Sequence, residues 1–255
     1  MKSITVKKSI VTAVLSVGLL MSVSVSVSAE TSNVENPVST VVSKIDVNAI
    51  QQGFEKNGVD KATQEKLLEK IKNGELLDSM NPEKAKDGVT TTTRPKVSVK
   101  STNTPAGFSS KTVFPDGSYI TVSVTPPSST SNDGGMSTQD VTPGPGTVCG
   151  SGYCAIRDAK VKWDNGVVSA YFLADYTFAY GTGGYDTINR VYQPSVYCLA
   201  GSYSDLSGPT IIRATETYYQ SAKASISWKY STKLGDTLQY LILDVQNDKA
   251  TSSSA

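Results

Sequence analysis

The sequence predicts a mainly β protein, an antiparallel β-sandwich preceded by a small helical hairpin. From about residue 107 onward, apolar residues recur at every second position in at least five segments, as in strands with one buried face. Residues 46–72 instead carry apolar residues three and four positions apart, which is the period of a helix. Long connections between the periodic segments favour a sandwich over an up-and-down barrel.

The first 29 residues have the features of a secretory signal peptide. Three lysines open the segment, an apolar run covers residues 10–23, and Val27-Ser28-Ala29 supplies small residues before Glu30. No later apolar stretch approaches the ~20 residues of a membrane-spanning helix. We therefore expect residues 1–29 to be removed and the protein to be secreted into an extracellular environment, without a stable membrane anchor.

Residues 30–86 form the predicted helical hairpin region. Asp46 is a suitable N-cap for a first helix that Gly58 ends, and Asp60 for a second helix that reaches Lys72 and ends at Asn73-Gly74. Their apolar faces comprise Val47, Ile50, Phe54, Leu67, Leu68 and Ile71. Helices this short are marginal alone in water, so the hairpin must dock. It packs on its own C-terminal domain, or it serves as a pro-region or partner-docking element.

The rest of the chain divides into a linker at 87–106, a sandwich domain at 107–248 and a disordered tail at 249–255. Within the sandwich, residues 126–147 are rich in Ser, Gly, Thr and Pro and predict a flexible loop. Pro115-Asp116-Gly117 and Asp164-Asn165-Gly166 predict tight turns. Buried strand faces are predicted at residues 168–178 and 222–230, and Leu238, Tyr240 and Ile242 end the ordered chain.

The composition excludes several kinds of chemistry. The chain contains no histidine, so Ser-His-Asp and Cys-His nucleophile systems are impossible, and the commonest metal ligand is missing. We expect no metal and no cofactor. The net charge is +1, which provides no field for nucleic acid.

The three cysteines predict one disulfide in an exported chain. Cys149 and Cys154 flank a flexible Gly-Ser-Gly-Tyr turn and form the favoured pair, which leaves Cys198 as a free thiol. Pairing of Cys198 with either of the other two remains the alternative.

Aromatic residues supply the candidate binding groups. The chain has 13 tyrosines against five phenylalanines. Eight fall on polar strand faces or loops: Tyr153, Tyr171, Tyr180, Tyr185, Tyr192, Tyr197, Tyr203 and Tyr219. Tyrosine provides contact area at low entropic cost, so we predict a ligand-binding surface with Tyr171, Tyr180, Tyr185 and Tyr203; scattered half-buried strand tyrosines are the alternative.

Trp163 and Trp228 lie on apolar strand faces. They are predicted to be core residues with satisfied indole N–H groups, or otherwise a stacking platform for sugars.

A pair of carboxylates could hydrolyse glycosides without histidine. Asp158, Asp164, Asp175 and Glu216 are the candidates, but no spacing singles out a pair, so no catalytic residue is assigned. Glu216 lies on a semi-apolar face and is expected to pair with Arg213 or Arg190.

Four segments together resemble secreted, uncharacterised proteins of Gram-positive bacteria. They are residues 57–80, Val113-Phe114-Pro115-Asp116-Gly117-Ser118, Trp163-Asp164-Asn165-Gly166 and Ala174-Asp175-Tyr176. The resemblance implies location and architecture but no activity. The sequence favours a non-enzymatic protein that binds an extracellular molecule, an envelope component or a protein partner. A secreted antimicrobial or membrane-active toxin and a carboxylate-dependent hydrolase are the alternatives.

Overall fold

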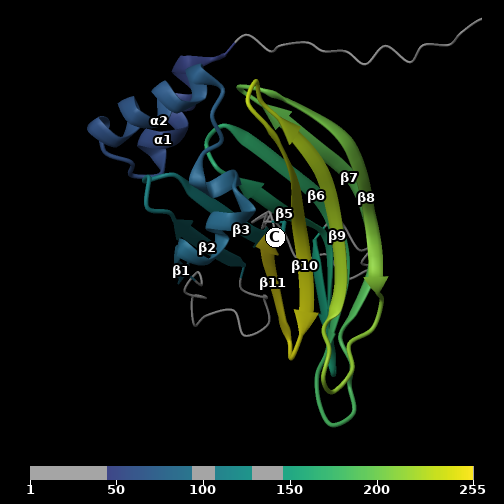
Figure 1. The fold of residues 1–255 in the computed structure, drawn as a ribbon. Helices are drawn as coiled ribbons and strands as arrows, with labels where there is room; N and C mark the ends of the chain where they lie inside the picture. The colour runs from purple at the N-terminus through teal and green to yellow at the C-terminus, as the bar shows by residue number, and fades with distance from the viewer. Residues whose placement is uncertain (1–44, 94–106, 128–145, 255) are drawn as a thin grey trace, which may run out of the picture. The chain divides into compact units, whose positions relative to one another are not determined.

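Two antiparallel sheets with a few short helices on the N-terminal side make up the fold, as the sequence predicts (Figure 1). The computed structural model describes residues 45–93, 107–127 and 146–254. The predicted signal peptide and most of the loop predicted at 126–147 lie outside these residues.

The first sheet has seven strands, paired in the order β1-β2-β3-β5-β6-β7, with β4 paired to β5. Their bounds are β1 Val89–Thr93, β2 Phe108–Val113, β3 Tyr119–Thr125, β4 Thr147–Gly150, β5 Tyr153–Asp164, β6 Val168–Ala179 and β7 Thr187–Cys198. The second sheet has the order β11-β10-β9-β8. Its strands are β8 Ser202–Arg213, β9 Ala222–Ser231, β10 Asp236–Gln246 and β11 Lys249–Ser254.

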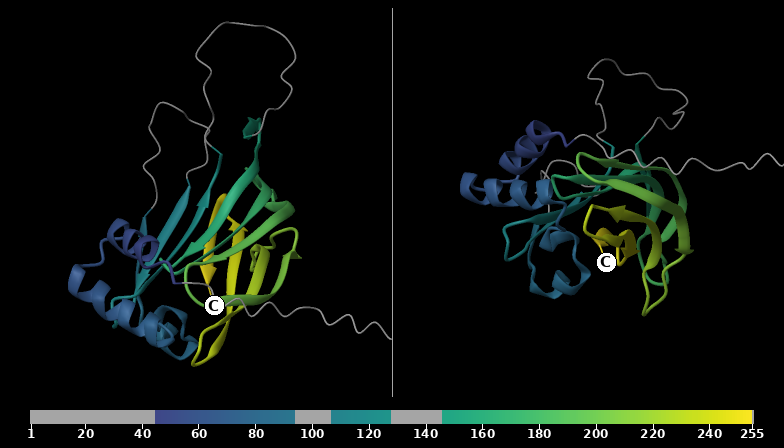
Figure 2. Two further views of the ribbon diagram at one scale, coloured as in Figure 1. Left: turned by 90° about the horizontal axis from the view of Figure 1, so that it is seen from above. Right: turned by 45° about the horizontal axis from the view of Figure 1, so that its top comes forward.

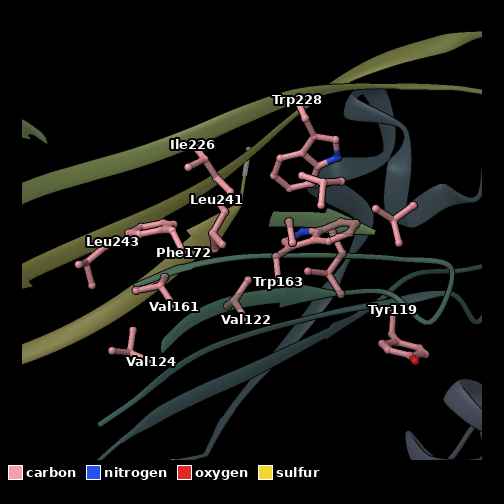
Figure 3. Close-up of a cluster of buried hydrophobic side chains, with 14 of the residues drawn as sticks. Tyr119, Val122, Val124, Val161, Trp163, Phe172, Ile226, Trp228, Leu241 and Leu243 are labelled. Atoms are coloured by element: carbon pink, nitrogen blue, oxygen red, sulfur yellow. The ribbon is translucent and has the colours of Figure 1, made fainter. Parts of the chain in front are cut away.

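The core lies between the two sheets, and its largest side chains are two tryptophans (Figure 3). Trp163 on β5 and Trp228 on β9 are both fully buried, with ring centroids 5.4 Å apart in an edge-to-face arrangement. This confirms their predicted core position. The expected hydrogen bonds are not present: neither indole N–H has a partner among the described residues. The backbones of β5 and β9 are paired in the sheet ladders, and the other buried side chains on the inner faces of these two strands are mostly apolar.

Strict alternation of burial confirms the predicted inner faces of β6 and β9. β10 is different, because the residues singled out from the sequence are not the ones that turn inward. Thr237, Gln239, Leu241, Leu243 and Val245 are buried, whereas Leu238 is 47% exposed. Apolar residues occur on both faces of β10, so the alternation in its sequence does not indicate which face is buried.

The helical segment comprises α1 Val47–Lys56, α2 Lys61–Asn73 and two 3-10 helices, η1 Asp78–Met80 and η2 Pro82–Asp87. The predicted caps form, since Asp46 accepts a hydrogen bond from the Ala49 N–H and Asp60 accepts one from the Thr63 N–H. Gly74 ends α2 in the left-handed conformation.

The helical hairpin docks on its own sandwich, which was the first of the sequence alternatives. Ile50 and Phe54 are fully buried, and the Phe54 ring meets Tyr119 of β3 at 6.3 Å between centroids. The Tyr119 hydroxyl donates a hydrogen bond to the Gly53 carbonyl oxygen at 3.1 Å. Figure 2 shows the helices beside the β1–β3 side of the first sheet.

Asp116, in the turn between β2 and β3, connects this turn to the helical segment. Its carboxylate accepts from the Lys70 ammonium at 2.9 Å, the Asp78 N–H at 3.0 Å and the Ser118 hydroxyl at 2.6 Å. Burial acts to raise the pKa of Asp116, but these hydrogen bonds outweigh it and lower the pKa.

Two edge strands lie where the sequence predicted an extended, β-prone linker and a disordered tail. β1 occupies part of the predicted 87–106 linker, and β11 occupies the predicted 249–255 tail. β1 is exposed at every position and pairs with β2, while β11 pairs along its whole length with β10. Both are Thr- or Ser-rich and lack an apolar period. Backbone pairing with a neighbouring strand, which composition does not reveal, accounts for their order.

Candidate functional site

Four loops come together at one end of the sandwich (Figure 1). They are the β4–β5 turn (151–152), the β6–β7 loop (180–186), the β8–β9 loop (214–221) and the β10–β11 turn (247–248). The Tyr180 N–H donates to the Gly152 carbonyl at 2.9 Å, and the Ile188 N–H donates to the Ala214 carbonyl at 2.7 Å. These bonds join neighbouring loops, and we call this surface, with Tyr153 at the start of β5, the tyrosine-loop end.

Five tyrosines project from the tyrosine-loop end. Their exposed fractions are 44% for Tyr153, 44% for Tyr180, 51% for Tyr185, 82% for Tyr218 and 87% for Tyr219. The last two rings contact each other edge to face, with centroids 4.8 Å apart. Exposed aromatic side chains on loops held by a rigid scaffold are typical of binding surfaces.

The four tyrosines predicted to form one ligand site do not meet. Tyr180 and Tyr185 share the β6–β7 loop. Tyr171 lies within β6 on the outer face of the first sheet, where the Lys160 ammonium sits 4.1 Å from its ring centroid. Tyr203 lies at the opposite end of β8 from the tyrosine-loop end. Composition alone does not distinguish tyrosines within strands from tyrosines on loops. Tyr218 was not predicted as a binding residue, although the adjacent pair Tyr218-Tyr219 could have indicated it.

Two buried carboxylates connect these loops by hydrogen bonds to backbone N–H groups. Asp186 accepts hydrogen bonds from the N–H groups of Ala179 at 3.0 Å and Asp248 at 2.8 Å. Glu216 accepts from the N–H groups of Asp186 at 3.1 Å and Asn247 at 3.0 Å. Asp186 and Glu216 are 1% and 9% exposed, so their charges point inward rather than toward a ligand.

The predicted pairing of Glu216 with an arginine is therefore wrong. Arg213 donates to the Ser221 carbonyl at 2.8 Å, and Arg190 pairs with Asp175 at 3.0 Å. Backbone N–H groups of the turns satisfy Glu216 instead, because a tight turn leaves such donors without a sheet partner.

The tyrosine-loop end should respond to acid through Asp186. Burial, opposed by its hydrogen bonds and helped by nearby carboxylates, raises the pKa of Asp186 to about 6. Because the native state then holds this proton more tightly than the unfolded state, its contribution to stability increases as the pH falls from about 6 toward 4. We expect the free energy of unfolding of the native sequence, relative to Asp186→Asn, to increase by about 2 kcal/mol between pH 7 and pH 4.5. Urea unfolding at both pH values measures this, and a difference that is flat or of opposite sign would contradict it.

Two of the hydrolase candidates do lie together. The Tyr192 hydroxyl donates to Asp158 and, at 3.3 Å, to Asp175, and Arg190 stacks 4.1 Å from the Tyr192 ring centroid. Asp158 sits at a bulge between β5 and β6, where its N–H donates to the Asp175 carboxylate at 2.9 Å. Asp158 and Asp175 thus both have hydrogen-bond partners within the fold. Neither carboxylate lines a cavity in the described part of the chain.

Asp164 and Glu216, the other two hydrolase candidates, are separate from this pair. Asp164 accepts from the Gly166 N–H at 2.9 Å within the β5–β6 turn and pairs with Lys162. Each of the four carboxylates therefore has a structural partner, and the catalytic alternative has no assembled site in the described part of the chain.

Cys149 and Cys154 form a disulfide across the β4–β5 pair. They are directly opposite in the strand register, with Cα atoms 4.0 Å apart. The bridge closes the turn that precedes Tyr153, so it braces one loop of the tyrosine-loop end. Cys198 is free and half-buried at the end of β7, and burial raises the pKa of its thiol to about 12.

Within the described ranges, no cluster of three or more His, Cys, Asp or Glu side chains is arranged to hold a metal ion. None of the helices in the described part of the chain is long and apolar enough to cross a membrane.

Comparison with known proteins shows a structural similarity but no family. No protein-family model matches the chain, and no curated protein matches it. Among solved structures, the chain is similar to a crystal structure described as the hypothetical protein lmo2686 from Listeria monocytogenes EGD-e, with 17% sequence identity and a TM-score of 0.30. The similarity covers 66% of this chain and 94% of that chain. This similarity carries no information on function.

Proposed function

We propose that the mature protein is a secreted, non-enzymatic binding protein that holds an extracellular partner with its tyrosine-loop end. The observation that carries the proposal is the group of five exposed tyrosines, four on loops and one at the start of β5, at one end of a disulfide-braced sandwich. Tyrosine rings combine an apolar face with a hydroxyl, so they contact a partner with little loss of side-chain entropy. The signal-like residues 1–29 and the disulfide support secretion into an oxidising environment.

The chemistry of this surface favours a neutral carbohydrate of the extracellular surroundings. Outward-facing residues of the four loops are mainly Tyr, Gly, Ser, Thr and Asn, while the carboxylates of Asp186 and Glu216 are turned inward. The β10–β11 turn carries one exposed carboxylate, Asp248, and it is followed directly by an exposed cation, Lys249, so these two opposite charges offset each other. A sugar ring offers C–H faces to aromatic rings and hydroxyls to polar loop groups, and it requires no opposite charge.

A binding assay on insoluble polysaccharides tests the proposal. We expect the full mature protein to co-sediment with an insoluble neutral polymer, for which β-glucan and chitin are the probes, and to bind acidic polygalacturonate less. The double variant Tyr218→Ser/Tyr219→Ser should bind at least ~10-fold more weakly, because exposed aromatic anchors dominate such interfaces. Tyr197→Ser is the matched control, since Tyr197 is 61% exposed on β7, outside the tyrosine-loop end.

Three results would count against the proposal. Equal binding by the double variant would move the site elsewhere, and equal losses with Tyr197→Ser would indicate nonspecific adhesion. Release of dye from phosphatidylcholine vesicles at the same concentrations, abolished by the double variant, would instead assign these tyrosines to a membrane-active toxin, since tyrosine is also favoured at bilayer interfaces.

A further inference from the structure

A second site lies away from the tyrosine-loop end, in a cavity of about 370 Å³. Its walls come from the two 3-10 helices η1 and η2, from β1, β2, β3 and the β2–β3 turn of the first sheet, and from β10 and β11 of the second sheet. The volume falls in the range of small-molecule pockets, roughly 300–1,000 Å³. The cavity therefore lies between the helical segment and strands of both sheets.

Two serines in the cavity wall have hydroxyls without a hydrogen-bond partner. Ser79 of η1 and Ser252 of β11 are 4% and 5% exposed, and neither hydroxyl oxygen is paired with any described residue. A buried hydroxyl without a partner costs free energy, so native structures normally satisfy it. Rotation about one side-chain bond is enough to redirect a serine hydroxyl toward a group inside the cavity.

The side-chain amide of Gln239 is a third polar group in the cavity wall. Gln239 of β10 is 5% exposed, and its amide nitrogen donates to the Met80 carbonyl at 3.0 Å and to the Thr237 hydroxyl at 3.1 Å. Its carbonyl oxygen accepts no hydrogen bond from the described residues, and the residue lines the cavity. The amide orientation follows from these two donated bonds, so the free group is an acceptor. A ligand hydroxyl would satisfy it.

Apart from the amide of Asn81, the remaining wall is apolar or hydroxyl-bearing, and none of the described residues that line the cavity has a charged side chain. Met80, Phe114, Ile120 and Val122 form its apolar part, while Thr112 adds another hydroxyl. The cavity opens to solvent past Pro82, Ala85 and Thr90, so a charged head group held against its inner wall would lose water without gaining an opposite charge. An uncharged ligand with an apolar body and hydroxyl groups matches both parts of the wall.

The geometry points to a binding site for a neutral amphiphile that carries hydroxyl groups, held between η1, β2–β3 and β10–β11. The apolar body lies against Phe114 and Ile120, and the hydroxyls bond Gln239, Ser79 and Ser252. This site is independent of the tyrosine-loop end, because none of the five exposed tyrosines lines it.

Calorimetric titration with a matched pair of probes tests the inference. We expect monodecanoylglycerol, below its critical micelle concentration, to bind the mature protein with one-to-one stoichiometry. Decanoate has the same chain but a charged head, and it should bind at least ~10-fold more weakly. Ser252→Ala should weaken monodecanoylglycerol binding by about fivefold to tenfold without lowering the melting temperature of the free protein, because the lost hydroxyl had no partner.

Variants that fill the cavity locate the site. Ser110→Leu places a larger side chain at a buried wall position of β2 and should abolish binding. Thr112→Leu, at a half-buried wall position, replaces Ser110→Leu as the test if that variant does not fold, and it should also abolish binding. Ser109→Leu, on the opposite face of the same strand, is the control and should bind normally.

The inference is overturned by any of three results. They are the absence of saturable binding by monodecanoylglycerol, equal affinity for decanoate, and unchanged binding in the folded cavity-filling variant. The Tyr218→Ser/Tyr219→Ser variant should bind monodecanoylglycerol as well as the native protein does. Failure of the carbohydrate proposal would therefore not affect the outcome of this titration.

Discussion

Replacing Trp228 with alanine should lower the free energy of unfolding by about 3–5 kcal/mol, as expected for a large core aromatic residue. Trp228 is fully buried on the inner face of β9, and its ring meets Trp163 of the opposite sheet at 5.4 Å between centroids (Figure 3). Truncation removes this contact and leaves a cavity between two sheets that cannot collapse without changing strand pairing. Urea denaturation followed by far-ultraviolet circular dichroism measures the loss.

Trp228→Phe separates packing from hydrogen bonding. The indole N–H has no partner among the described residues, so the phenyl ring keeps most of the contact and gives up no bond. We expect it to cost less than half as much as Trp228→Ala. The Trp163→Ala/Trp228→Ala double variant should show a coupling of about 0.5–1.5 kcal/mol between the two rings. A near-native melting temperature for Trp228→Ala would mean that the ring is not a core residue.

Local patterns predicted the central strands and turns because both are encoded over a few residues. Alternation in 168–178 and 222–230 identified the inner faces, and Asp164-Asn165-Gly166 identified the turn between β5 and β6. β1 pairs with β2 across a long intervening segment, and β11 pairs with β10 across the two-residue turn 247–248. Neither Thr- or Ser-rich segment has an apolar period, so its pairing was not predicted. In β10 both faces carry apolar residues, and pairing with β9 and β11 determines which face is buried.

The candidate sites required information that the sequence does not contain. Tyr180 and Tyr185 were predicted because they fall on polar faces or loops, but the approach of residues 214–221 to their loop depends on the sheet topology. Ser252, in the predicted tail, became a cavity residue only because β11 pairs with β10. Glu216 was noticed for its semi-apolar surroundings, although its partners are turn N–H groups that no spacing rule reveals.

Gly166→Ala should weaken the attachment of the helical hairpin and cost about 2–5 kcal/mol, the sum of backbone strain and overpacking. Gly166 has a φ of 83°, and a Cβ there would lie 2.7 Å from the Tyr119 hydroxyl oxygen and 2.8 Å from the Phe54 ring. Both rings are fully buried where α1 meets β3, so neither has room to move away. Gly53 of α1 also approaches the Gly166 backbone, which leaves no space for a side chain between helix and turn.

Gly152→Ala is the matched control, since Gly152 also has a φ of 83°. A Cβ at this position would have only the Tyr180 carbonyl oxygen nearby, at 3.9 Å, so the variant should show the backbone strain alone, about 1–2 kcal/mol. Urea unfolding compares the two variants, and limited proteolysis should cut residues 45–88 faster in Gly166→Ala than in Gly152→Ala. Equal costs and equal cleavage would show that the hairpin does not pack tightly on the β5–β6 turn, because only the Gly166 variant places an atom between them.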